Sequence, residues 1–331
     1  MRIPLLLSLI AALLVCSYAP EAVAGDGETL KIGTLVPKHS SWGKVFRVWS
    51  LAVKKKTDGR LRLKFYWNGS QGNEATMVGK VRAGQLDGAA LGAAGLGHIH
   101  KPIMALQLPG LFREWQDIDR AQKAVLAEFQ QACEKKGFYL STIGAVGRAR
   151  AMSSGRAIRT PEDLKGMKPV GIRSDLVGPT FSSVLGTTRV PLSVPEILPA
   201  LSQGRVNFLV APPLITEQLQ WAPHLDHVTD EVLGIGIGAM VLSKPRLDGL
   251  EHGLVQVLKK TGDKAGKMLR KRIRRHDDAA YERIKRRMTV VQLSDAQRDR
   301  WEGIFAQIRN RLAQGTFPEP LVRRLEKVAG K

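Results

Sequence analysis

Cysteine is scarce in this sequence. Only Cys16 and Cys133 occur among its 331 residues, and Cys16 falls in an N-terminal segment that we expect to be removed. The single remaining thiol cannot form an internal disulfide, so the mature fold must depend on its packed core. Small secreted scaffolds held together by disulfides are thereby excluded as a class.

Long apolar runs are missing after the N-terminus, where no segment reaches the roughly 18 apolar residues of a membrane-spanning helix. Residues 1–24 have the form of a secretory signal peptide, with a short Leu/Ile/Ala run and a cleavage site of small residues at Ala22-Val23-Ala24. Because Val15 precedes Cys16, where lipid attachment prefers a small residue, we do not expect a lipid anchor. We expect a soluble periplasmic protein.

Motifs of the common enzyme classes are also missing. There is no GxxxxGK[ST] phosphate loop and no GxSxG nucleophile motif, and the glycine-rich stretch Gly234–Met240 lies within an expected strand. The histidine pairs His98/His100 and His224/His227 have no acidic or cysteine cluster to complete a metal site. We therefore expect no enzymatic activity, no metal and no cofactor.

Acidic residues are few relative to basic ones. The chain has 30 Asp and Glu against 51 Lys and Arg, for a formal net charge of +21. Such a charge favours anionic surfaces, although the expected export argues against nucleic acid as a partner. Many basic residues concentrate in 264–275 and 283–287. At helical spacing they form a solvated face or, alternatively, a surface that docks on an acidic partner or an anionic membrane.

The remaining pattern alternates strands and helices, without internal repeats. An initial βαβαβ series predicts a parallel sheet with helices on its faces. A second α/β series follows. The expected elements are strands 30–35, 61–67, 86–91, 138–143, 168–172, 206–210 and 235–242, and helices 42–56, 74–82, 117–136, 175–185, 194–202 and 295–312.

A very long helix is expected over 250–288, where apolar residues recur on one face. At 1.5 Å per residue it would span about 58 Å, which is longer than a small domain is wide. We therefore predict that it crosses two domains. The expected division is 25–146 plus about 235–260 for domain I and 147–234 for domain II, with a C-terminal helix and tail over 294–331. We expect Ser294 to cap this helix.

Several motifs share their order and spacing with one family. The chain resembles the periplasmic solute-binding proteins of TRAP (tripartite ATP-independent periplasmic) transporters, of the C4-dicarboxylate type, as a divergent branch. The segments that carry the resemblance are LKIGTLVPKHSSWGKVF, WNGSQGNEATMVGKVRAGQLDGA, LQLPGLFREWQD, RTPEDLKGMK, VPLSVPEILPALSQGRVNFLVAPP and AMVLSKPRLDGL.

The resemblance implies a two-domain α/β clamshell that closes on a small organic ligand. Such a protein delivers its ligand to a permease with a large and a small membrane subunit, in some cases with an accessory periplasmic protein. We expect a monomer with no catalytic role.

The arginine that binds the ligand carboxylate in this family has no clear counterpart here. The resemblance places it at Val170 or Gly171, and Arg173 comes two or three residues late in the strand. In the segment from Asn207 to Pro212, Ala211 stands at the ligand-facing Asn position. Because burying a carboxylate without a cation costs several kcal/mol, we predict a largely apolar or neutral ligand.

One alternative keeps the carboxylate. Arg148 and Arg150 lie in GAVGRARAM, at the expected crossover between the domains. They flank Ala149, the position at which the resemblance places another arginine of the family. Either of them, or a shifted Arg173, would then bind an organic acid.

Other candidate ligand contacts lie in loops after the strands. Trp42 follows the first strand, Trp67, Asn68 and Glu74 follow the second, and Gly95 lies after the third. The resemblance implies that Glu74 hydrogen-bonds the ligand, although the helix dipole also favours an acid in a first turn. Gly95 either lets the backbone approach the ligand or forms a tight loop.

Two aromatic residues are candidates in the second half. Trp221 follows Pro212-Pro213, an expected hinge, and would cover the pocket; Phe181 lies on the helix expected over 175–185. Both have a structural alternative, because a large aromatic residue is equally at home in a core.

Overall fold

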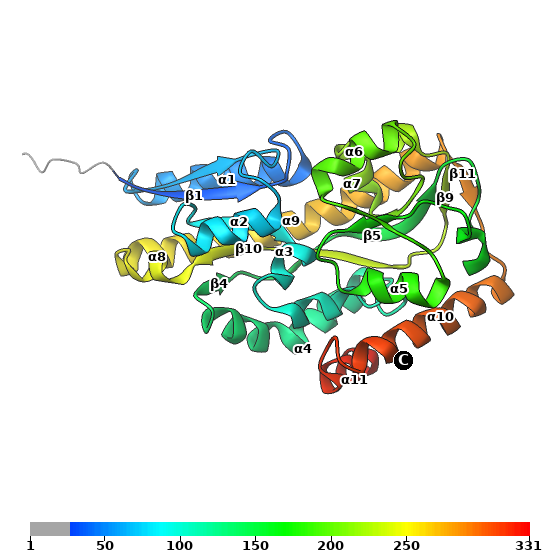
Figure 1. The fold of residues 1–331 in the computed structure, drawn as a ribbon. Coiled ribbons are helices and arrows are strands. Elements are labelled where there is room, and N and C mark those ends of the chain that lie inside the picture. The colour runs from blue at the N-terminus through cyan, green and yellow to red at the C-terminus, as the bar shows by residue number, and fades with distance from the viewer. Residues whose placement is uncertain (1–26) are drawn as a thin grey trace, which may run out of the picture.

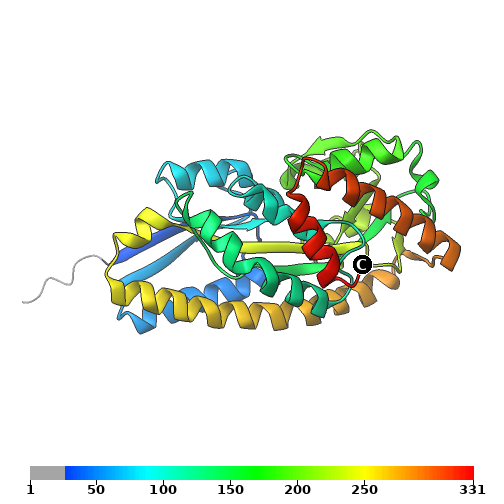
Figure 2. The ribbon, with the colours of Figure 1, turned by 90° about the horizontal axis from the view of Figure 1, so that it is seen from below.

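The computed structural model describes residues 27–331, so the expected signal peptide and Cys16 lie outside the described residues. Two α/β domains lie side by side, and one long helix runs along both (Figures 1 and 2). This is the predicted two-domain architecture. None of the helices in residues 27–331 is both long enough and apolar enough to cross a membrane.

The first domain is built on the predicted βαβαβ unit. Strand β1 pairs in parallel with both β2 and β3. The crossover helices α1 and α2 begin after Ser40 and Asn73, whose side chains accept backbone hydrogen bonds at the helix N-termini. The elements are β1 (Glu28–Thr34), α1 (Ser41–Lys56), β2 (Leu61–Tyr66), α2 (Glu74–Arg82) and β3 (Gly88–Gly92).

The sheet is mixed rather than purely parallel. Strand β10 (Gly234–Ser243) returns from the second domain and pairs antiparallel with β3, β4 (Phe138–Leu140) and β5 (Gly144–Ser153). The path through the sheet is β11 (Thr289–Val291), β9 (His227–Thr229), β5, β10, β3, β1 and β2. The parallel arrangement predicted from the βαβαβ order is confirmed for β1 to β3. Strand β10 adds an antiparallel neighbour, because a strand that re-enters a domain need not follow a crossover helix.

Strand β5 belongs to both domains. Its first half pairs with β10, and its second half pairs with β8 (Phe208–Ala211) and β9 (His227–Thr229). A separate parallel pair, β6 (Val170–Ile172) and β7 (Val190–Leu192), forms a small sheet in the second domain. The helices of this domain are α5 (Val177–Leu185), α6 (Val194–Ser202) and α7 (Pro213–Gln218).

The long helix is observed as α9 (His252–Lys285), with α8 (Lys244–Asp248) as a separate short helix before it. It packs on α1 of the first domain and on α7 of the second (Figure 2). Its 34 residues correspond to about 51 Å at 1.5 Å per residue. The helix therefore provides a continuous support for both domains.

The C-terminal region also touches both domains. Helix α10 (Asp295–Ala313) begins after the capping residue Ser294, as predicted, and packs against α5. Helix α11 (Glu319–Val328) follows and packs against α4 (Trp115–Glu134) of the first domain (Figure 1). Strand β11 (Thr289–Val291) connects α9 to α10 and pairs with β9.

Candidate ligand-binding cavity

A cavity of about 690 Å³ lies between the two domains. The first domain contributes the loop after β1, the start of α1 and the β3–α3 turn, where α3 spans Ala93–Gly97. The second domain contributes β6, α5, β8 and α7, and β10 crosses between the two walls. Its volume lies in the range of roughly 300 to 1,000 Å³ that is typical of small-molecule sites.

Most of the cavity wall is apolar. Trp42, Phe46, Phe181 and Trp221 line it together with many aliphatic side chains. Trp42 and Trp221 are only 8% and 5% exposed, and Phe181 stacks on Trp301. These aromatic residues therefore support the core and face the cavity at once, so the two alternatives considered from the sequence are compatible.

One arginine from the second domain reaches into this wall. Arg189 immediately precedes β7, and its guanidinium passes over two glycines. A Cβ atom on Gly171 would lie 3.2 Å from Nη1 of Arg189, and a Cβ atom on Gly178 would lie 2.1 Å from the same nitrogen. The missing side chains of these glycines thus create the space that the guanidinium occupies.

Asp175 is the ionic partner of this arginine. Its Oδ2 lies 3.7 Å from Nη1 of Arg189, which is beyond normal hydrogen-bonding distance. The carboxylate instead accepts backbone hydrogen bonds from Val177 at 3.0 Å and Gly178 at 2.8 Å, at the start of α5. Burial raises the pKa of Asp175, although these two hydrogen bonds lower it. Asp175 therefore caps α5 and leaves the donors of Arg189 available.

Glu74 lies in the wall formed by the first domain. Its two carboxylate oxygens accept hydrogen bonds from the backbone N–H groups of Gly92 and Gly95, the second at 3.0 Å. Burial raises the pKa of Glu74, and both hydrogen bonds oppose this shift. Gly95 itself does not line the cavity; a Cβ atom there would lie 2.9 Å from Cβ of Glu74, so glycine is needed for this contact.

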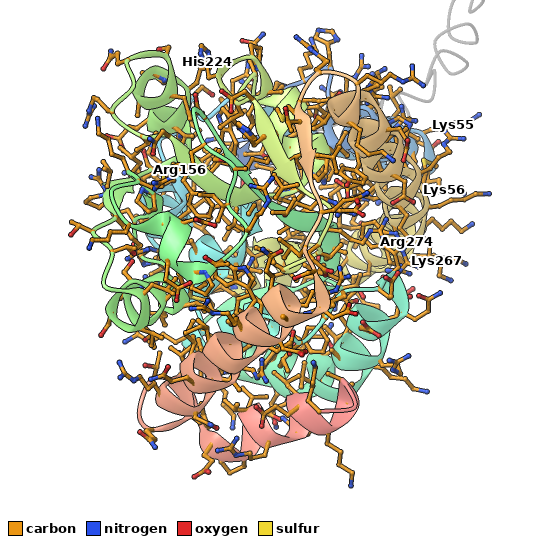
Figure 3. All side chains as sticks on the ribbon, turned by 90° about the vertical axis from the view of Figure 1, so that its right-hand side faces the viewer. Lys55, Lys56, Arg156, His224, Lys267 and Arg274 are labelled. Carbon is orange, nitrogen blue, oxygen red and sulfur yellow. The ribbon has the colours of Figure 1, made fainter. Side chains whose placement is uncertain are left out.

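Further charges border the cavity from α9. They are Lys259, Asp263, Lys267 and Arg270. The first three are exposed, and Figure 3 shows Lys267 pointing outward from the molecule. The three exposed side chains therefore belong to the rim, whereas Arg270 is half-buried.

The three arginines proposed from the sequence do not line the cavity. Arg148 donates to Asp278 at 2.7 Å and stacks on Trp115. Arg173 is exposed and donates to Glu196 at 3.1 Å. Both guanidinium groups are therefore held by acidic partners outside the cavity, which corrects their assignment as ligand contacts.

Arg150 is buried for a structural reason. Its guanidinium lies 3.7 Å from the ring centroid of Tyr281 and donates to the carbonyl oxygens of Thr229 and Asp230. Burial lowers the pKa of Arg150. It joins β5 to the β9 region and α9, so its expected place at the ligand is also corrected.

Three other candidates lie away from the cavity. Trp67 stacks on Phe65, with ring centroids 5.1 Å apart. Asn68 adopts a positive φ of 56° in the turn, which Asn tolerates better than most residues. The Asn207 side chain accepts a hydrogen bond of 2.7 Å from the backbone of Lys168. By contrast, Val170, Ala211 and Pro212 do line the cavity.

The histidine pairs do not form a metal cluster. Within residues 27–331, no group of three or more His, Cys, Asp or Glu side chains is arranged to hold a metal ion. The remaining cysteine, Cys133, is buried and free, and burial raises its pKa to about 11.

One protein family matches nearly all of the described residues. Residues 32–315 match the family described as DctP, bacterial extracellular solute-binding protein, family 7. This chain belongs to that family. The resemblance to TRAP solute-binding proteins is thereby confirmed, and the family is one of transport proteins found in the periplasm.

Solved structures share the fold at low sequence identity. A TRAP periplasmic solute-binding protein from Sulfurospirillum deleyianum, with bound succinate, has a TM-score of 0.85 at 18% identity and covers 91% of this chain and 99% of its own. A sugar acid binding protein from Advenella mimigardefordensis, in complex with galactonate, has a TM-score of 0.86 at 18% identity, with 92% and 98% covered.

Curated relatives match over shorter stretches. A solute-binding protein from Chromohalobacter salexigens is 25% identical over 50% of this chain and 49% of its own. The 2,3-diketo-L-gulonate-binding periplasmic protein YiaO from Escherichia coli is 23% identical over 66% of this chain and 67% of its own. The chain thus spans about half the length of the first of these relatives.

Proposed function

We propose that this protein is the solute-binding subunit of a TRAP transporter and that its ligand is an organic acid. The observation that carries the proposal is the guanidinium of Arg189 in the wall of the interdomain cavity. A planar guanidinium binds a carboxylate through two parallel hydrogen bonds, which a lysine cannot reproduce. The solved relatives named above bind succinate and galactonate, both of which carry carboxylates.

This proposal replaces the neutral ligand expected from the sequence. That expectation rested on the absence of an arginine at positions 170 and 171, which are Val and Gly. A cation instead comes from Arg189, on a neighbouring segment that the sequence pattern did not indicate. The alternative expectation was an organic acid bound by Arg148, Arg150 or Arg173. We retain the organic acid and assign its carboxylate to Arg189.

The transport role follows from the family and the two-domain cavity. We infer that the signal peptide exports the chain to the periplasm, and that domain II, about 147–234, closes on domain I around the ligand. The closed protein would then deliver the acid to the large and small membrane subunits of the permease. We infer a monomer in solution, with an accessory periplasmic protein as an optional partner.

A ligand screen tests the proposed function. Thermal unfolding of the purified protein would be followed with a panel of organic acids, each paired with its neutral amide. A ligand that binds only the folded state raises stability by roughly 2.7 kcal/mol at a concentration of 100 times its Kd. We expect stabilisation by at least one acid and not by its amide. Equal stabilisation by acid and amide would contradict an organic-acid function.

A second role is favoured by the distribution of charge. Lys55 and Lys56 at the end of α1 and Lys267 of α9 point outward along one edge of the molecule in Figure 3, where Arg274 of α9 is paired with Asp119 of α4. The two helices pack together, so their basic side chains share one surface. We infer that this surface, called here the α1–α9 basic face, docks on the anionic membrane beside the permease.

A further inference from the structure

A second polar side chain, that of Ser182, lies near Arg189 in the wall of the cavity. Ser182 lies on α5 four residues after Gly178, so both residues face the same side of the helix. Gly178 is the residue over which the guanidinium of Arg189 passes. Ser182 lines the cavity, and its hydroxyl oxygen is buried and has no hydrogen-bond partner within the described residues. Buried hydroxyls are normally paired, so this one is suited to a ligand oxygen.

Within residues 27–331, no basic residue of the second domain other than Arg189 lines the cavity. Outside α9, the other charged groups that line it are carboxyls, Asp175 beside Arg189 and Glu74 in the opposite domain. The remaining basic residues that line the cavity, Lys259, Lys267 and Arg270, all belong to α9. A second ligand carboxylate placed against the wall of the second domain would therefore be buried without a partner, which is strongly unfavourable.

The rest of the wall is suited to an apolar body. Val170 and Ile172 of β6, Val210 of β8 and the aromatic residues Phe181 and Trp221 all face the cavity. Val210 is 44% exposed, although it is a large apolar residue. A polyhydroxylated body would lose hydrogen bonds to water against such a surface, whereas an apolar body gains by covering it.

We propose that the cavity selects a monocarboxylic acid with an apolar body, whose single carboxylate is bound by Arg189 and Ser182. This inference rests on the proposed organic-acid function and narrows its substrate class. The carboxylate would accept two hydrogen bonds from the guanidinium and one from the serine hydroxyl. The body would lie against the apolar wall of the second domain.

Four probes of related structure test the substrate class by calorimetric titration. Octanoate has one carboxylate and an apolar body, octanedioate adds a second carboxylate, octanamide removes the charge, and galactonate has one carboxylate on a polar body. We expect octanoate to bind at least about 10-fold more tightly than the other three, because an unpaired buried polar group costs on the order of 1 to 3 kcal/mol.

The outcomes separate the inference from the proposed function. Tighter binding of octanedioate or galactonate would overturn the inference and leave an organic-acid function standing. Octanamide that binds as well as octanoate would overturn both. Binding by none of the four would overturn the inference, and the wider screen of acids would then decide the function.

Variants test the two side chains. We expect Arg189→Met to weaken octanoate binding by about 10- to 100-fold and Ser182→Ala by a few-fold, since hydrogen bonds to charged groups are the stronger class. Arg189→Lys keeps the positive charge but cannot donate two parallel hydrogen bonds to a carboxylate. Its affinity for octanoate should therefore lie between those of Arg189→Met and wild type. Circular dichroism and the melting temperature would establish that each variant is folded.

Two matched controls complete the design. Arg205→Met removes an exposed arginine of the second domain that does not line the cavity, and Ser183→Ala removes an exposed serine next to Ser182 on α5. Neither change should alter octanoate affinity by more than about two-fold, which is the scale of ordinary surface substitutions. A third variant, Arg270→Met, removes the arginine that lines the cavity from α9. If it abolishes binding while Arg189→Met does not, the assignment of the carboxylate site is wrong.

Discussion

The carboxylate of Asp277 accepts a hydrogen bond of 2.8 Å from the backbone N–H of Arg148, at the point where β5 passes from one domain to the other. Its second oxygen accepts a hydrogen bond of 3.1 Å from the backbone of Leu214, at the start of α7. Gly147 adopts a φ of 151° beside it, and a Cβ atom there would lie 2.2 Å from Pro212. One buried carboxyl of α9 thus ties the crossover strand to the second domain.

This arrangement predicts a pH dependence of stability. Burial raises the pKa of Asp277 from 3.8 to about 6. Asp277 therefore binds its proton more tightly in the folded state than in the unfolded state. The stability that this proton contributes is fully present below about pH 4 and is lost as pH rises through about 6. Between these limits the free energy of unfolding falls by on the order of 3 kcal/mol. Urea unfolding of wild type and Asp277→Asn at several pH values between 4 and 7 measures it.

The Asp277→Asn variant shows how stability depends on pH when residue 277 cannot titrate. Asparagine does not titrate, so the free energy of unfolding of Asp277→Asn should fall less between pH 4 and 7 than that of wild type. Parallel curves for the two proteins would show that Asp277 does not titrate in this range. Leu247→Ala, a core substitution in α8 away from the crossover, should lower stability without changing the slope.

Much of the fold could be predicted because its signals are local. The helix expected over 194–202 is observed as α6 with the same bounds, and the cap at Ser294 starts α10 as expected. Strands β7 and β9 have only three residues each, too few for an alternating pattern to be recognised. Strand β5 was expected only as a crossover, because its Arg and Gly residues interrupt the apolar pattern.

The site was harder to predict because its key contact is non-local. Arg189 reaches Gly171 only because β6 and β7 pair in parallel, with Gly171 opposite Pro191. The sequence shows the absence of an arginine at Gly171, but it does not show that a neighbouring strand supplies one. Arg148 and Arg150 were named from their position in the chain, and their acidic and aromatic partners became visible only in the folded structure.

The contact between Glu74 and Gly95 predicts that substitutions at these two positions have non-additive effects on the free energy of unfolding. Gly95→Ala would place a Cβ atom 2.9 Å from Cβ of Glu74 and 3.0 Å from Cβ of Leu91. We expect a loss of about 1 to 3 kcal/mol of unfolding free energy, the usual cost of overpacking. The cost should be smaller in a Glu74→Gly background, where both the Cβ atom and the carboxyl are gone. A double-mutant cycle by urea unfolding measures this coupling. Additive effects of the two changes would contradict the contact.

The space beside Gly171 predicts a loss of ligand affinity. Gly171→Ala would place a Cβ atom 2.9 Å from Cβ of Arg189 and 3.2 Å from its Cζ. The arginine must then move, so we expect acid binding to weaken by roughly 10-fold, the loss of about one hydrogen bond to a charged group. Gly234→Ala is the matched control, because Gly234 lines the cavity with no atom within 4 Å of an added Cβ. Equal affinities for the two variants would contradict the proposed position of Arg189.

The α1–α9 basic face predicts binding to anionic membranes. Changing Lys55, Lys56 and Lys267 together to Glu reverses three exposed charges on this face. Each basic residue near an anionic surface contributes about 1 kcal/mol, so we expect the variant to lose most of its binding to phosphatidylserine vesicles in a sedimentation assay at 0.15 M salt.

The control for this experiment matches the change in charge. Lys123, Lys165 and Lys327 are exposed lysines outside α1 and α9, and their replacement by Glu lowers the net charge by the same six units, two for each Lys→Glu change. If the inference is correct, this variant keeps most of its vesicle binding, because attraction to a membrane decays within roughly 8 Å at this ionic strength and acts on the facing charges. An equal loss in both variants would mean that net charge, rather than the α1–α9 basic face, drives the association.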